Sequence, residues 1–208
     1  MLVRGHPLNA TGRFTLVCVD EELRSLGDRL RGESGESVLC RRLLETEDRD
    51  ELAGVLTAGA QPLWARELAA FRLGCAGDAR AFETLVLLLN HRDPERCVSA
   101  AHALARLGDP RTARAAAALA TIRLRTAYAL HPVRLLTVLR APESVPALIA
   151  TLERLLPADP HWRSALACVE GLAELGDSRA RPALEAALAH PRLAAAAAGA
   201  LGRLSPRV

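Results

Sequence analysis

The sequence contains no lysine, although lysine and arginine together number 27 among its 208 residues. Because every one of these cations is an arginine, enzymes that use a Schiff-base lysine or the lysine of a phosphate-binding loop are excluded. Aromatic residues make up only 3% of the chain. A core must therefore be built from Leu, Ala and Val, which pack helices closely, and this composition favours an all-α protein.

Closely spaced metal or redox ligands are also missing. The histidines show no HxxxH or HExxH spacing, so we expect no metal site and no cofactor. No run approaches the length of a membrane span, and the first residues lack the apolar stretch of a secretion signal. We therefore expect a cytoplasmic protein without a membrane partner. The cysteines are too widely spaced for a zinc knuckle and are expected to pack as small apolar side chains: Cys18, Cys40, Cys75, Cys97 and Cys168.

What the sequence does contain is an internal repeat. The stretch "LARLGDPRTARAAAAL" (104–119) is similar in sequence to "LAELGDSRARPALEAAL" (172–188). Related stretches begin at Gly77 and Ala141. Counted at Asp78, Asp109, Ala141 and Asp177, the copies follow one another after 31, 32 and 36 residues. A period of this length with small insertions is typical of repeat architectures.

Each copy carries signals for two helices joined by a short turn. Glycine ends the preceding helix in a left-handed conformation, and aspartate caps the next helix. Prolines open the second helices at Pro62, Pro94, Pro160 and Pro191. One pair cannot cover its own apolar stripe, so neighbouring pairs must stack. We predict about five pairs in one continuous domain over residues 48–208, behind an N-terminal cap over residues 1–47.

Two segments depart from this pattern. In the cap, "RFTLVCVD" predicts a short strand or the start of a helix, whereas "DEELRSLGDRLR" and "ESVLCRRLLE" predict helices. In the third repeat, Pro132 falls inside the second helix expected over about 124–139. Proline removes an intrahelical hydrogen bond, so we expect that helix to be kinked or split.

The stretches "GDSRARPAL" and "APESVPAL" resemble the turn of the HEAT-like repeat family, in the short form also found in phycobilin lyases. The resemblance covers about residues 48–204 and implies a right-handed α-solenoid whose second helices line a concave surface. It does not select a function, because members include scaffolds, chaperone-like adaptors, lyases and nucleic-acid binders.

Charge is distributed unevenly along the chain. Residues 20–51 hold eleven acids and six arginines, whereas residues 110–142 hold six arginines and no acid. An arginine run of this kind is either a solvated helix face or a contact for an acidic partner.

Large side chains recur at nearly the same place in successive second helices, thirteen to fifteen residues before each anchor. Either they pack between repeats or they line a groove that binds a partner. The residues at this place are Trp64, Arg96, Tyr128 and Trp162. The predicted binding site adds residues from neighbouring turns of the same helices: Arg66, His131, Arg134 and Arg163. No catalytic residue is predicted. We expect an interaction scaffold or adaptor for an acidic protein, with nucleic-acid binding or a lyase-like or chaperone-like action on a small molecule as alternatives.

Overall fold

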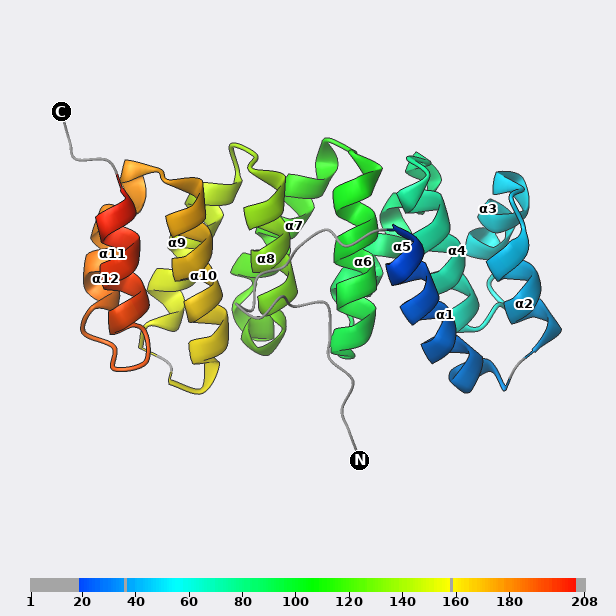
Figure 1. The fold of residues 1–208 in the computed structure, drawn as a ribbon, viewed down its shortest axis with the longest axis horizontal. Coiled ribbons are helices and arrows are strands. Elements are labelled where there is room, and N and C mark those ends of the chain that lie inside the picture. Colours follow the sequence, from blue (N-terminus) through cyan, green and yellow to red (C-terminus); the bar gives the residue numbers. More distant parts are fainter. Residues whose placement is uncertain (1–18, 36, 158, 205–208) are drawn as a thin grey trace. The chain divides into compact units, whose positions relative to one another are not determined.

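The computed structural model describes residues 19–35, 37–157 and 159–204, and every regular element in these ranges is a helix (Figure 1). The prediction of an all-α protein is confirmed for this part of the chain. Both helices predicted in the cap are present, as α1 (Val19–Ser34) and α2 (Val38–Glu45). The alternative of a strand at "RFTLVCVD" falls almost entirely outside the described residues.

The chain forms two compact units. Unit 1 comprises the described residues of Met1–Leu89 together with Glu95–Asp109, and unit 2 comprises Asn90–Pro94 and the described residues of Pro110–Val208. Unit 1 contains α1, α2, α3 (Arg49–Thr57), α4 (Leu63–Cys75), η1 (Ala79–Ala81), α5 (Phe82–Leu89) and most of α6 (Pro94–Leu107). Unit 2 contains α7 (Arg111–Thr121), η2 (Arg123–Tyr128), α8 (Leu130–Leu139), α9 (Ser144–Leu155), η3 (Asp159–His161), α10 (Trp162–Leu175), η4 (Ser178–Ala180), α11 (Arg181–Ala187) and α12 (Ala194–Arg203).

The turns between repeats have the predicted chemistry. Gly77, Gly108 and Gly176 adopt positive φ angles of 75°, 67° and 70°, which glycine accepts without steric cost. Asp177 then accepts a hydrogen bond from the backbone N–H of Arg179 at 2.9 Å, and Asp78 plays the same part in its own repeat. The third turn differs, because its left-handed position is occupied by Arg140, with a φ of 50°.

In unit 1, helix α4 is central and packs against α1, α2, α3 and α5. Its buried residues include Leu68, Phe71 and Leu73. Gly74 lets α6 approach closely, since a Cβ atom there would lie 3.1 Å from Cβ of Ala103. This close approach brings Glu67 of α4 within hydrogen-bond distance of Arg96 and Ser99 of α6.

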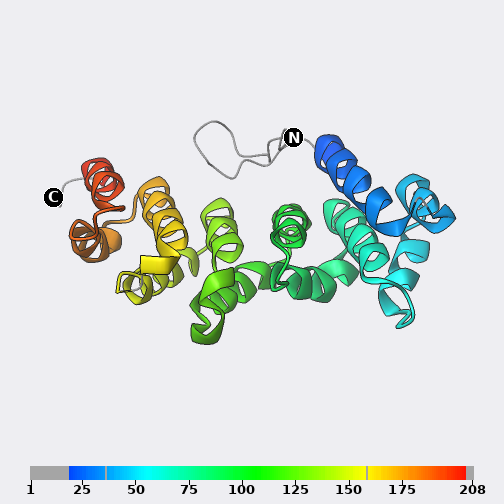
Figure 2. The same ribbon diagram turned by 90° about the horizontal axis from the view of Figure 1, so that it is seen from below.

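In unit 2, the helices form two rows (Figure 2). The first helices of successive pairs, α7, α9 and α11, pack in series, and so do the second helices, α8, α10 and α12. Leu136, Leu148 and Leu172 are fully buried between them. Each pair thus covers the apolar face of its neighbour within this unit, as the repeat requires.

The third repeat is irregular at the predicted place. Helix α7 ends at Thr121, the 3-10 helix η2 follows, and α8 begins only at Leu130. Pro132 is then the third residue of α8, where the missing N–H has no intrahelical partner to lose. The proline therefore splits the expected helix.

Across the described residues, no helix is both long and apolar enough to cross a membrane.

Candidate interaction surface

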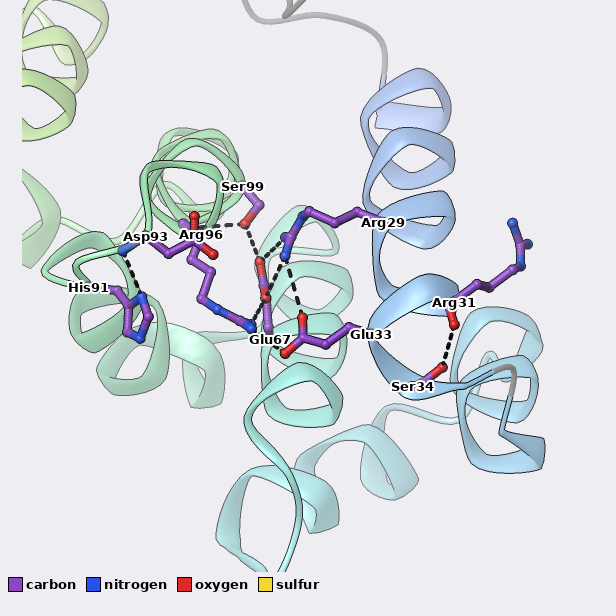
Figure 3. Close-up of polar contacts among 9 residues, drawn as sticks. All are labelled: Arg29, Arg31, Glu33, Ser34, Glu67, His91, Asp93, Arg96 and Ser99. Carbon is purple, nitrogen blue, oxygen red and sulfur yellow. Dashed lines mark hydrogen bonds and ion pairs between the residues drawn. The ribbon is translucent and has the colours of Figure 1, made fainter. Parts of the chain in front are cut away.

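Unit 1 holds a buried network of charged side chains (Figure 3). Glu67 on α4 is only 1% exposed, and its carboxylate accepts hydrogen bonds from Arg29 on α1 and from Arg96 on α6. Ser99 donates a further hydrogen bond to Glu67 Oε1 at 2.8 Å. Arg96 also pairs with Glu33 of α1. The network ties α1, α4 and α6 together.

One of the predicted binding residues, Arg96, belongs to this network. The Arg96 side chain is only 7% exposed, so it offers little surface to a partner. The sequence does not reveal the pairing, because Glu67 and Arg96 lie on different helices 29 residues apart. The one available signal is that this separation is close to the repeat period, which places the two residues on neighbouring repeats.

The other two predicted residues of unit 1 are Trp64 and Arg66. Both lie in the first turns of α4 and are half-buried. The Nε atom of Arg66 is buried and has no hydrogen-bond partner among the described residues. Neither residue reaches the charged network through a hydrogen bond or ion pair.

In unit 2, guanidinium groups of arginines lie over the rings of Tyr128 and Trp162. The guanidinium of Arg125 lies 4.9 Å from the centre of the Tyr128 ring. Those of Arg163 and Arg192 lie 5.0 and 5.4 Å from the centre of the Trp162 ring. Trp162 is half-buried and Arg163 is exposed. Such cation–π pairs leave an aromatic surface with a positive charge over it.

His131 and Arg134, the remaining predicted residues, lie on α8, which packs against α10. His131 is buried and Arg134 is half-buried. Burial lowers the pKa of Arg134, and the charge of Glu170 partly offsets this effect. Of the predicted residues in unit 2, Tyr128 thus belongs to η2, His131 and Arg134 belong to α8, and Trp162 and Arg163 begin α10.

A second feature of unit 2, the exposure of Leu124 in the segment 122–128, was not predicted from the sequence. Leu124 is 98% exposed, and Tyr128 is 38% exposed. Arg123, between Ile122 and Leu124, is also exposed. The apolar period of a helix places leucines in a core, and only the break into η2 turns this one outward.

The described residues contain no cluster of three or more His, Cys, Asp or Glu side chains that could hold a metal ion. Burial raises the pKa of the Cys75 thiol to about 12, and it also raises the pKa of Cys168. Both thiols are therefore protonated near neutral pH and are poor nucleophiles.

No family model matches the sequence, and a search of curated proteins finds no related chain.

Proposed function

We propose that the protein is a HEAT-like interaction scaffold, built as a right-handed solenoid of about five helical pairs. Its acidic protein partner docks on the concave face lined by second helices. The cytoplasm is the compartment we propose for it. The observation that carries the proposal is the pairing of partly exposed aromatic rings with arginines on unit 2, at Tyr128 and Trp162.

Physical chemistry supports this choice of surface. Tryptophan, tyrosine and arginine are the residues most often found where binding energy is concentrated in protein interfaces. Arg163, which stacks on the Trp162 ring, is exposed, and the N–H groups of such an arginine can donate to carboxylates of a partner. The segment 110–142 contains arginines and no acidic residue. It therefore attracts an acidic partner and carries no carboxylate that would repel that partner.

Affinity capture with a matched pair of variants tests the proposal. The full-length protein and the double variant Trp162→Ala, Arg163→Glu are each used to capture proteins from the native host. We expect at least one acidic protein to be recovered with the wild type and lost with the double variant. Arg24→Glu is the control, because Arg24 is an exposed arginine of α1 in unit 1.

Each recovered protein is then purified, and its Kd is measured against the three forms. A recovery that the double variant leaves unchanged contradicts the proposed surface. Binding to random duplex DNA is measured at low and high salt in parallel. Tight, strongly salt-dependent DNA binding with no protein recovered would favour the nucleic-acid alternative instead.

A further inference from the structure

The segment 122–128, which we call the η2 tip, exposes one apolar side chain almost fully and two more in part. Leu124 is 98% exposed, and Ile122 and Tyr128 are 36% and 38% exposed. A single exposed leucine is ordinary on a protein surface. Here three apolar side chains are exposed within one short segment, and grouped apolar exposure marks contact sites more often than scattered residues do.

Hydrogen bonds donated by two arginines hold the η2 tip in place. Arg125 donates a hydrogen bond to the backbone oxygen of Asn90 at 2.6 Å. Arg154 donates to the backbone oxygen of Ala120 and to Oγ1 of Thr126, both at 2.8 Å. These bonds hold the backbone on either side of Leu124. A patch that is already ordered loses little conformational entropy when a partner binds.

The surroundings of the η2 tip are positively charged. The side chains of Arg92 and Arg123 are exposed and form no hydrogen bond or ion pair with any described residue. Two further arginines, Arg125 and Arg154, make the anchoring hydrogen bonds. Only two acidic residues stand next to any of these four arginines in the sequence, namely Asp93 beside Arg92 and Glu153 beside Arg154. The patch is thus apolar in its middle and basic around it.

We propose that the η2 tip binds an acidic amphipathic segment of a partner protein. Apolar side chains of that segment cover Leu124 and Tyr128, and its carboxylates pair with Arg92 and Arg123. This inference rests on the proposed scaffold function and specifies the partner's chemistry. A nucleic acid would satisfy the arginines through its phosphates but would leave Leu124 in water, so the apolar centre favours a protein.

Two synthetic peptides of equal length and charge test the inference by fluorescence anisotropy with the full-length protein. The first is glutamate-rich with leucines at helical spacing, and the second has each leucine replaced by glutamine. We expect the wild type to bind the first peptide about tenfold or more tightly than the second. Leu124→Ser should weaken binding of the first peptide by a similar factor, and Arg123→Glu should weaken it and reduce its salt dependence.

The matched control is Leu87→Ser, because Leu87 is another leucine, 72% exposed, on α5 of unit 1. It should bind the first peptide as the wild type does. Leu124→Ser should leave the melting temperature unchanged, since the side chain is almost fully in solvent, and Leu124→Met should retain binding.

Equal affinity of the wild type for the two peptides would overturn the inference, as would full binding by Leu124→Ser. Preference for a duplex oligonucleotide over the first peptide would overturn it as well. If Trp162→Ala abolishes capture of the host partner while Leu124→Ser does not, the η2 tip is not the docking site and the scaffold function still holds.

Discussion

His102 on α6 is fully buried in unit 1, and neither ring nitrogen has a hydrogen-bond partner among the described residues. The ring stacks on Phe71 with 5.8 Å between centroids. Burial lowers the pKa of His102 to about 4, and the charge of Arg106 acts in the same direction. Glu22 lies 3.9 Å from Nδ1 and is the opposing charge. Near neutral pH the side chain is therefore an uncharged aromatic core residue.

This burial makes stability depend on pH. In the unfolded chain the histidine has a pKa of roughly 6.5, above the folded value, so protonation favours unfolding. The contribution is fully present above the unfolded pKa and is lost as pH falls toward about 4. The loss amounts to up to roughly 3 kcal/mol.

His102→Leu should remove this part of the pH dependence, as measured by urea unfolding between about pH 7 and pH 4.5. His161→Leu, at a half-exposed histidine of unit 2, is the matched substitution with which its slope is compared. An unchanged slope in His102→Leu would show that other groups dominate acid unfolding.

The charged network predicts unequal effects for two acidic residues that contact the same arginine. Glu67→Ala leaves the buried guanidinium of Arg96 without its principal partner, and we expect a loss of about 3–5 kcal/mol. Glu33 is 38% exposed, so Glu33→Ala should cost less than about 1 kcal/mol. Chemical denaturation measures both free energies of unfolding. Equal losses of unfolding free energy in the two variants would mean that burial does not make Glu67 more important for stability than Glu33.

At the scale of elements, the four turns between repeats offer an internal comparison. A side chain in the left-handed conformation costs about 1–2 kcal/mol, so Gly176→Ala should destabilise by about that amount. Arg140 already bears this strain. Arg140→Gly should therefore be at least as stable as the wild type, even though it loses the exposed ion pair with Glu174.

Thermal unfolding measures both variants, and Glu174→Ala gives the contribution of the ion pair by itself. A lower melting temperature for Arg140→Gly than for Glu174→Ala would contradict the assignment of strain to this turn.

The same turns show what the sequence can specify. Gly77, Gly108 and Gly176 were predictable because glycine and aspartate determine turn geometry locally. The interruption before α8 was predictable because Pro132 acts on its own helix. Burial of Arg96 and exposure of Leu124 were not, since they depend on which helices meet in three dimensions. The predicted binding site stays a prediction, and its residues belong to both units.

At the scale of the whole molecule, each unit has its own buried core. Leu68 belongs to the core of unit 1 and Leu152 to that of unit 2, and both are fully buried. Repeat proteins are stabilised by contacts between neighbours, so a local defect weakens its own surroundings most. Truncating either leucine should cost about 2–5 kcal/mol locally.

Hydrogen exchange measured by mass spectrometry tests this expectation. Leu68→Ala should accelerate exchange in α4 and the helices packed on it, and Leu152→Ala should do so in α9 and α10. Uniform acceleration over all described helices in either variant would show that the chain unfolds as one cooperative whole.

The burial of the thiols also decides how this protein can be labelled. Cys40, Cys97 and Cys168 are buried, and the pKa of Cys75 is raised to about 12, while thiol reagents attack the thiolate. These four cysteines should therefore react slowly with a maleimide, and the absence of lysine removes the usual amine targets. With Cys18 replaced by serine, Ala127→Cys would add one reactive thiol at an exposed position of the η2 tip, and a fluorophore attached there would report on contact.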